Sequence, residues 1–248
     1  MNIYQKLKGL VLSGVCEMVG EDPVNRLTIQ RRPVVCPPAN STPMPVASEA
    51  EAAYSEQAAT LAAECLTLAD LYRVRDLFDG CPLKKTAAHT LNGHGVNSPV
   101  VLCLVATPDR EDEKAGSLFA GAVGAKAGQM LGAIGLDLQK NTYVSALIPW
   151  RPPGNRKPTP AEIAACQPFW EKEIDLLNPK LIIAFGSDVS KMLLQSGSLS
   201  KMRGSWHSYR SRPLRVCIAP AMVIKQPEQR RPAWEDIQAV RQKLTEIT

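Results

Sequence analysis

Four short, mostly apolar runs, each followed by a segment with helical spacing, constrain the fold of this chain most strongly. Their lengths suit strands, and their apolar content is typical of strands that are buried on both faces. The runs cover residues 100–106, 142–148, 181–185 and 214–218. Because strand–helix alternation is typical of parallel sheets, we predict an α/β fold. The predicted architecture is a three-layer sandwich, with a four-stranded, mainly parallel sheet and helices on both faces.

The segments around these runs predict the helices. Apolar residues recur there with the spacing of one helix face, over residues 125–134, 160–177, 188–195 and 234–247. A further helical pattern starts at Ser48 and ends before Gly80. It leaves open whether one helix continues past Asp70 or a second helix starts near Thr67. Ligands of such sheets bind at the carboxyl ends of the strands, so function is expected in the loops at that edge.

The first 48 residues differ in character from the rest. Residues 1–30 predict a helical N-terminal extension, which starts with an amphipathic pattern and lacks a signal-peptide cleavage pattern. Residues 31–48 are rich in Pro, Ser and Ala without a hydrophobic period, and they predict a flexible linker. No apolar run reaches the roughly 18 residues needed to span a bilayer. We therefore expect a cytoplasmic monomer without a membrane partner, whose α/β domain covers residues 49–248.

Seven cysteines are scattered along the chain, and no two of them form a C-x-x-C pair. Close pairs are typical of metal sites, and an even number of cysteines is typical of a disulfide framework. Scattered cysteines in an odd number match neither pattern. They indicate buried thiols in a reducing compartment.

The charge is unevenly distributed along the chain. Residues 1–150 carry 13 Lys and Arg against 15 Asp and Glu, whereas residues 151–248 carry 16 against 9. Within residues 201–231, eight basic residues accompany a single acid, Glu228. One-sided positive charge is expected of a protein that meets polyanions. A solvated surface would give the same pattern, so charge alone leaves both interpretations open.

The most specific motif covers residues 150–166, WRPPGNRKPTPAEIAAC. It makes a stiff basic loop after the second apolar run and then starts a helix. Thr159 suits an N-cap, Pro160 suits the first helical position, and Glu162 completes a capping box. A rigid basic loop that leads into a helix N-terminus suits a phosphate backbone. An ordinary strand-to-helix connection with solvated charges would look the same.

This motif resembles the RPPGNR-x-PTP-x-EI-x-x-C segment of the iron–sulfur, "family 4" uracil-DNA glycosylases. The resemblance covers about residues 67–245, and the order and spacing of the matched pieces agree with the family. The other matches are Cys81-Pro82-Leu83, Gly116 with Phe119, residues 127–131, Gly135-Leu136, residues 178–180 followed by Ala184-Phe185-Gly186, residues 203–207 and Trp234-Glu235-Asp236. The resemblance implies a uracil-DNA glycosylase-like fold, DNA as a partner and a base-excision repair context.

The resemblance also implies that the base pocket has lost its reactive groups. The family's GEAPG-like loop, which helps to hold the attacking water, here reads VATPD, with Ala106 at the acid position and Pro108 retained. Ala146 stands at the position of the uracil-reading asparagine, and the loop from Ala219 lacks the family's histidine. Phe119, which would stack on the flipped base, is retained.

Each lost group had a physical role. An amide pairs with a donor and an acceptor on the uracil edge, and an imidazole stabilises charge on the leaving base. Loss of one such donor costs on the order of 10²–10³ in rate, so three alanines predict a degenerate site. The acids that follow Pro108 are candidates for activating water if excision survives: Asp109, Glu111 and Asp112.

The iron–sulfur cluster of the family is expected to be absent. Two of its four cysteine positions match, Cys81 and Cys166, whereas the other two hold Phe78 and Trp150. Two thiolates do not hold a [4Fe–4S] cluster in the usual Cys₄ manner. We therefore predict no cofactor and no metal, with the two aromatic side chains filling the vacated space.

The DNA-facing part of the family pattern is better kept. Predicted DNA-binding residues are Arg151, Asn155, Arg156, Ser187, Lys201 and Arg203. Three hypotheses remain: a non-catalytic or strongly altered glycosylase relative that binds single- or double-stranded DNA, an active divergent glycosylase that hydrolyses the N-glycosidic bond of a damaged base, and a non-enzymatic interaction protein. We favour the first, because the scaffold is kept and the pocket is emptied.

Overall fold

The computed structural model describes residues 49–195 and 199–247, which belong to one compact unit of the chain. The predictions for residues 1–30 and 31–48 lie outside the described residues. Among those that are described, no helix is long and apolar enough to cross a membrane.

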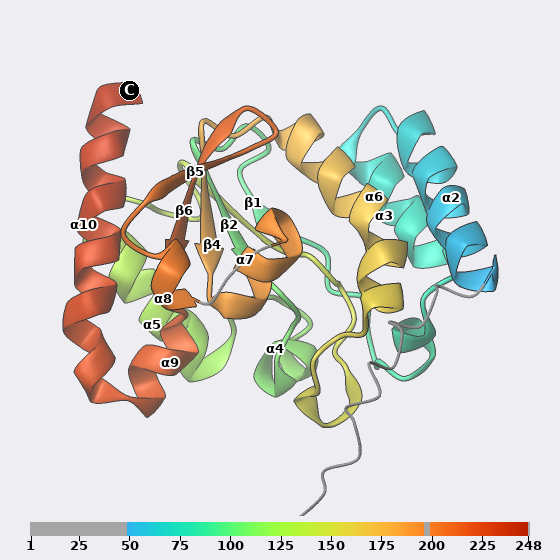
Figure 1. Ribbon diagram of the computed structural model, residues 1–248, viewed down its shortest axis with the longest axis horizontal. Helices are drawn as coiled ribbons and strands as arrows, with labels where there is room; N and C mark the ends of the chain where they lie inside the picture. The colour runs from blue at the N-terminus through green and yellow to red at the C-terminus, as the bar shows by residue number, and fades with distance from the viewer. Residues whose placement is uncertain (1–48, 196–198, 248) are drawn as a thin grey trace, which may run out of the picture. The chain divides into compact units, whose positions relative to one another are not determined.

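A six-stranded sheet of order β1-β3-β2-β4-β6-β5 forms the centre of the described chain (Figure 1). Its four inner strands run parallel and correspond to the four predicted runs. They are β2 (Val101–Val105), β3 (Thr142–Ala146), β4 (Leu181–Phe185) and β6 (Arg212–Cys217). The fold class predicted from the sequence is therefore confirmed.

Two short antiparallel strands extend the sheet beyond the four that were predicted. They are β1 (His94–Gly95), which pairs with β3, and β5 (Trp206–Tyr209), which pairs with β6. Both lie at an edge, and both are short and partly exposed, so neither has the apolar content that identified the inner strands. The predicted number of strands was therefore too low by these two edge strands.

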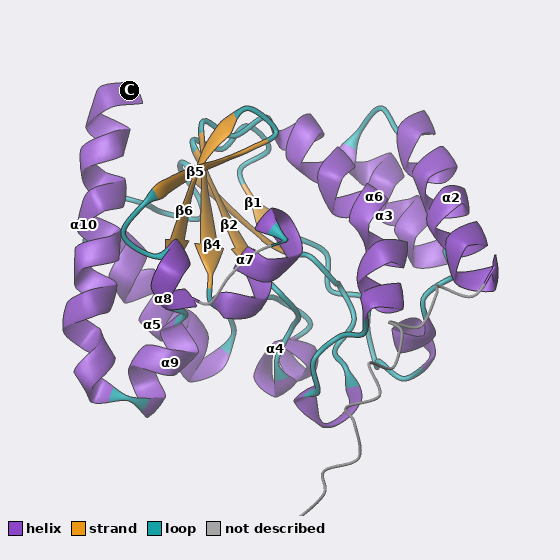
Figure 2. Cartoon of the chain, viewed as in Figure 1, coloured by secondary structure: helices purple, strands orange, loops and turns teal. Residues whose placement is uncertain are grey.

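Helices cover both faces of the sheet (Figure 2). On one face α6 (Pro160–Leu177) lies beside α2 (Glu49–Glu64) and α3 (Leu68–Leu77), together with α7 (Ser187–Leu194) and α8 (Leu199–Met202). On the other face lie α5 (Gly121–Gly132) and α10 (Arg230–Ile247). The remaining helices are α4 (Arg110–Ala115) and α9 (Pro220–Lys225), with short 3₁₀ turns at Pro82–Lys85, Pro153–Asn155 and Pro227–Gln229.

The side chains of each inner strand point alternately to the two faces of the sheet, which explains why helices cover both faces. Leu102 and Leu104 of β2 pack into the core under α6, whereas Val101 and Cys103 pack into the core under α5 and α10. Successive side chains of a strand point to opposite faces, and all four of these are apolar and buried. A strand of this kind is stable only inside a three-layer structure.

The structure also decides between one helix and two near Thr67. The Thr67 side chain accepts a hydrogen bond from Asp70 N at 3.1 Å, and α3 starts with Leu68. A hydroxyl that satisfies a free N–H of the first turn is a standard N-cap. The second alternative, a helix that restarts near Thr67, is therefore the correct one.

A buried polar network between α3, α6 and β3 was not predicted. The Glu173 carboxylate accepts hydrogen bonds from Tyr72 Oη at 2.6 Å, Ser145 Oγ at 2.9 Å and Arg75 Nη1 at 3.3 Å. Arg75 also donates to Asn92, and Tyr72 hydrogen-bonds Tyr143. Burial is the largest cause that raises the pKa of both tyrosines, so they remain neutral.

Candidate functional site

The carboxyl ends of the four parallel strands meet at one edge of the sheet, the end to which the arrows point in Figure 1. Leu147 N donates to Val105 O at 2.9 Å, and Gly186 N donates to Cys217 O at 2.9 Å, so the loops leave the strands side by side. This edge brings together most of the predicted site residues. In an open α/β sheet it is also the usual place for a ligand.

Phe119, Ala146 and Ala219 lie in one apolar cluster at this edge, together with Phe185. The rings of Phe119 and Phe185 meet edge to face, with centroids 6.0 Å apart. Phe119 adopts a left-handed backbone conformation with φ of 58°. A Cβ on Gly124 would lie only 1.5 Å from Phe119 O, so this conformation requires a glycine at position 124.

The other two predicted pocket residues, Ala106 and Pro108, lie in the loop after β2. Ala106 packs against the core on the α6 side of the sheet, and Pro108 is buried. The three alanines offer methyl groups where the family resemblance places a carboxylate, an amide and an imidazole. The geometry therefore supplies a stacking ring but no charge-stabilising donor from these positions.

Two of the three candidate acids, Asp109 and Asp112, cap the N-terminus of α4. The Asp109 carboxylate accepts from Glu111 N at 2.8 Å and Asp112 N at 2.9 Å, and Asp112 accepts from Asp109 N at 3.1 Å, which completes a capping box. Asp112 also accepts from Ala120 N at 2.8 Å. Burial raises the pKa of Asp112 above its usual range, although these N–H donors oppose the shift.

The third candidate acid, Glu111, is exposed and forms an ion pair with Lys114 at 3.0 Å. Asp109 and Asp112 thus have structural partners, and Asp112 fixes the backbone next to Phe119. This capping box was not predicted, although Asp109 and Asp112 have the three-residue spacing that is typical of one. A role for the three acids in activating water stays a prediction.

The basic loop before α6 is braced by acids of the same molecule. Arg151 donates to Glu113 Oε2 at 2.8 Å and to Asn155 Oδ1 at 2.7 Å. Arg156 donates to both carboxylate oxygens of Glu162, at 2.8 and 2.5 Å. Burial would raise the pKa of Glu162, but the bonds from Arg156 and from the Thr159 backbone hold it below its usual value. The predicted capping box at Thr159 is present.

Most arginines of the predicted basic segment also have acidic partners. Arg203 and Arg215 both pair with buried Asp236, at 2.7 and 3.7 Å, and Arg215 lies over the Trp206 ring. Arg210 and Arg212 pair with Asp175. Lys201 is exposed and pairs with no acid in the described part of the chain. The positive charge of this segment is thus largely compensated within the fold.

Arg203 and Lys201 differ in a way that stability measurements can test. Changing Arg203 to alanine is expected to lower the free energy of unfolding by about 1.5–3 kcal/mol, because buried Asp236 loses a charge-assisted hydrogen bond. The matched control Lys201→Ala should change it by less than about 0.5 kcal/mol. Urea unfolding measures both, and equal effects would contradict a structural role for Arg203.

The two retained cysteines lie in contact inside the core under α6. Cys81 and Cys166 are hydrogen-bonded to each other, which lowers the pKa of Cys81, while burial raises the pKa of Cys166. The Phe78 ring meets Phe169 edge to face at 5.1 Å, and Trp150 Nε1 donates to Thr90 Oγ1 at 3.1 Å. All four side chains at the family's cluster positions are buried in this one core.

These residues do not fit a [4Fe–4S] cluster, because two of the four positions hold packed aromatic rings instead of thiolates. No group of three His, Cys, Asp or Glu side chains suited to a metal occurs among the residues that the structure describes. The described cysteines are all buried free thiols, as predicted: Cys65, Cys81, Cys103, Cys166 and Cys217.

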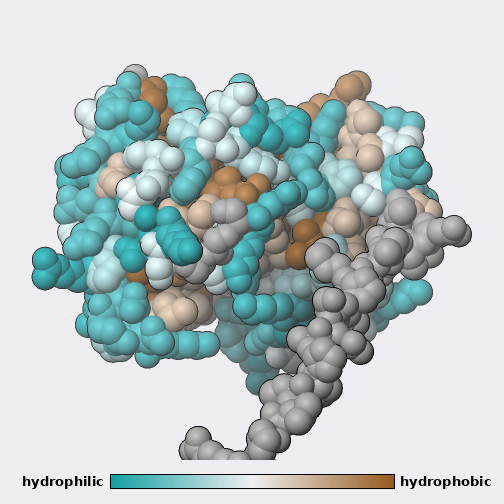
Figure 3. Space-filling view, in the orientation of Figure 1, coloured by the Kyte–Doolittle hydropathy of each residue, from teal (hydrophilic) through white to brown (hydrophobic). Residues whose placement is uncertain are grey.

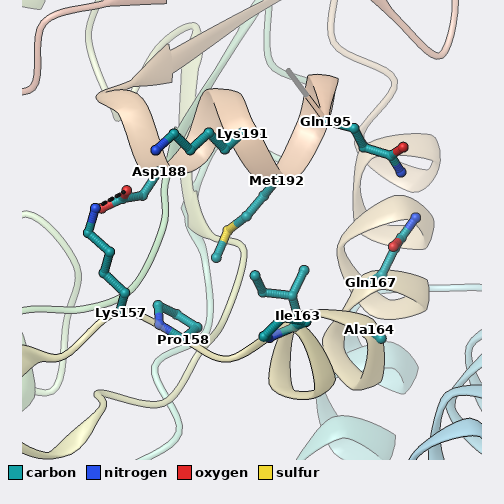
Figure 4. Close-up of a pocket in the computed structure, with 10 residues that line it drawn as sticks. Lys157, Pro158, Ile163, Ala164, Gln167, Asp188, Lys191, Met192 and Gln195 are labelled. Carbon is teal, nitrogen blue, oxygen red and sulfur yellow. Dashed lines mark ion pairs between the residues drawn. The ribbon is translucent and has the colours of Figure 1, made fainter. Parts of the chain in front are cut away.

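A cavity of about 330 Å³ lies between α6 and α7, with Asp188 among its lining residues (Figure 4). Ile163 and Met192 form its apolar floor, and Lys157 at its border pairs with Asp188 at 3.2 Å. In the space-filling view, apolar surface near the centre of this face is surrounded by hydrophilic surface (Figure 3). The cavity is thus partly apolar, with an ion pair beside it.

Comparisons with known proteins agree with the geometry. The model of the "Uracil DNA glycosylase superfamily" matches residues 93–238. The type-4 uracil-DNA glycosylase of Pyrobaculum aerophilum is 28% identical over 180 residues, which are 68% of this chain and 91% of that protein. The type-4 uracil-DNA glycosylase of Sulfurisphaera tokodaii is 26% identical over 172 residues, 65% of this chain and 78% of that protein.

A third relative differs in its overall organisation. The DNA polymerase of Bacillus phage SP01 is 25% identical over 146 residues, which are 59% of this chain but only 16% of the polymerase. The superfamily model alone covers more than half of this chain. The chain therefore belongs to the uracil-DNA glycosylase superfamily, and within it this protein is similar to the type-4 enzymes.

Proposed function

We propose that this protein binds DNA in a repair context and that its uracil-excision site is degenerate. The observation that carries the proposal is the apolar cluster of Phe119, Ala146 and Ala219 at the carboxyl edge of the sheet. The ring that would stack on a flipped base is in place, whereas the alanines at positions 146 and 219 offer no donor or acceptor side chains. These three positions can therefore contact a base without stabilising the charge that develops when the base leaves.

The proposal extends to the cofactor. We propose that the protein functions without an iron–sulfur cluster, because Phe78 and Trp150 fill the core beside the hydrogen-bonded thiols of Cys81 and Cys166. Packed aromatic rings stabilise this part of the core by burial, as ligation does in a metal site. On this proposal, folding does not depend on iron.

One observation favours an active divergent glycosylase as a second candidate. Phe119 keeps its position through its left-handed backbone and the glycine at 124, and exposed Glu111 is the one candidate acid without a capping role. Glu111 would then have to activate water. Its carboxylate is exposed to solvent and paired with Lys114 at 3.0 Å.

The test combines excision and binding on one substrate. Purified protein is incubated with a labelled oligonucleotide that carries one uracil, and hot alkali then cuts any abasic site. We expect no cutting above that of a buffer control. In the same buffer, fluorescence anisotropy of the labelled oligonucleotide measures its binding. We expect the logarithm of the affinity to fall linearly with the logarithm of the salt concentration, because phosphate contacts release counterions.

Two outcomes would contradict the proposal. Cutting that disappears in a Glu111→Gln variant would establish the active alternative, with Lys114→Gln as the control for the ion pair. Binding no stronger than that of an unrelated basic protein of similar net charge would remove the DNA-binding function and favour a non-enzymatic interaction protein.

A further inference from the structure

A second cavity, of about 220 Å³, lies between α5 and α10 on the face opposite α6. Its walls combine an aromatic ring, two cations and an amide over an apolar floor. We call it the Trp234 cavity, and the residues that line it include Lys126, Gln129, Met130, Val223, Arg230 and Trp234. Trp234 is 42% exposed, so part of a large aromatic side chain is accessible to a ligand.

The two cations of the Trp234 cavity have no acidic partner among the described residues, and Arg230 differs in this from the other arginines of the basic segment. No acid lines it, and Lys126 and Arg230 pair with no carboxylate in the described ranges of the chain. The Lys126 ammonium instead donates to Gln129 Oε1 at 3.5 Å. Two cations next to a partly exposed aromatic side chain form a combination suited to a nucleotide, whose base stacks while its phosphate is neutralised.

The chain links the Trp234 cavity directly to Phe119 and Ala219 at the carboxyl edge of the sheet. Helix α5, which carries Lys126 and Met130, starts two residues after Phe119, and α9, which carries Val223, starts directly after Ala219. Met130 lies nine residues beyond the start of α5, about 13 Å along the helix at 1.5 Å per residue. Figure 1 shows α9 and the start of α10 at the sheet edge to which the strands point.

We propose that the Trp234 cavity is a second base-binding subsite, which takes an unpaired nucleotide of a DNA strand held at this edge. The inference rests on the proposed DNA-binding function and goes beyond it. Trp234 stacks on the base, and Lys126 and Arg230 contact the flanking phosphates. Because the faces of bases are hidden in a duplex, the subsite distinguishes unpaired from paired DNA.

Anisotropy of a labelled oligothymidine and of a duplex of equal length tests the subsite with the full chain. Trp234→Ala is expected to weaken single-strand binding about tenfold and duplex binding less than twofold, while Trp234→Phe keeps most of the affinity. The matched control is Trp206→Ala on β5, a tryptophan of similar exposure outside the cavity. It should leave the single-strand preference unchanged.

A second variant tests the phosphate contacts and leaves the Trp234 ring unchanged. Lys126→Gln/Arg230→Gln should make the slope of log affinity against log salt shallower by about 1.4 for single-stranded DNA, since each phosphate contact contributes about 0.7. If the wild-type protein binds DNA but neither variant changes these values, the subsite is wrong and the proposed function stands. If the wild-type protein binds no DNA, both proposals fail. Equal losses on duplex and single strand would also overturn an unpaired-base subsite.

Discussion

Replacing Arg75 with methionine is expected to lower the free energy of unfolding by about 3–5 kcal/mol. The Arg75 and Glu173 side chains are 1% and 2% exposed, and they form an ion pair at 3.3 Å. Without the guanidinium, Glu173 keeps its hydrogen bonds from Tyr72 and Ser145 but loses the only cation paired with it in the described part of the chain. An unpaired charge in the core costs far more than the net value of the pair itself.

Urea unfolding of wild type and variant measures this loss. The matched control is Arg73→Met, two residues earlier on α3, whose side chain is 74% exposed and pairs with Asp70 on the same helix. This change should cost less than about 1 kcal/mol, because exposed ion pairs contribute little. The double variant Arg75→Met/Glu173→Gln should be more stable than Arg75→Met alone. If Arg75→Met lowers the free energy of unfolding no more than Arg73→Met does, the structural role of the buried network is contradicted.

The double variant Phe78→Cys/Trp150→Cys is expected to gain an iron–sulfur cluster that the wild-type protein lacks. It restores thiols at the two positions that now hold rings, next to the hydrogen-bonded Cys81 and Cys166. Without iron the variant should be destabilised by at least about 3 kcal/mol, since replacing a buried Phe or Trp with a small residue costs about 3–5 kcal/mol each. Cluster binding should recover part of that loss.

Anaerobic incubation with iron and sulfide, followed by iron and sulfide analysis, tests this prediction. We expect about four irons per chain in the double variant and none above background in wild type. Phe78→Ala/Trp150→Ala is the matched control, because it opens the same space without thiols and should bind no cluster. A wild-type chain that takes up four irons would contradict the proposed absence of the cofactor.

The fold was predictable because its determinants are local. Apolar content identified the strands at 181–185 and 100–106 with errors of at most one residue at each end, and Thr159 with Glu162 identified the start of α6. These signals involve residues within a few positions of one another. The edge strand β1 was not predicted, because a strand of two residues is too short to show an alternating hydrophobic pattern.

The site was less predictable, because partners far apart in sequence decide what each charged residue does. DNA contacts of Arg151 and Arg203 stay a prediction from the sequence. The structure adds partners that the sequence did not indicate: Glu113, 38 residues from Arg151, and Asp236, 33 residues from Arg203. Glu173 meets Arg75 across 98 residues. Strand pattern and helix caps were thus determined by the sequence itself. Only the tertiary structure determined which charges are compensated, because ion pairing depends on distance in space and on burial.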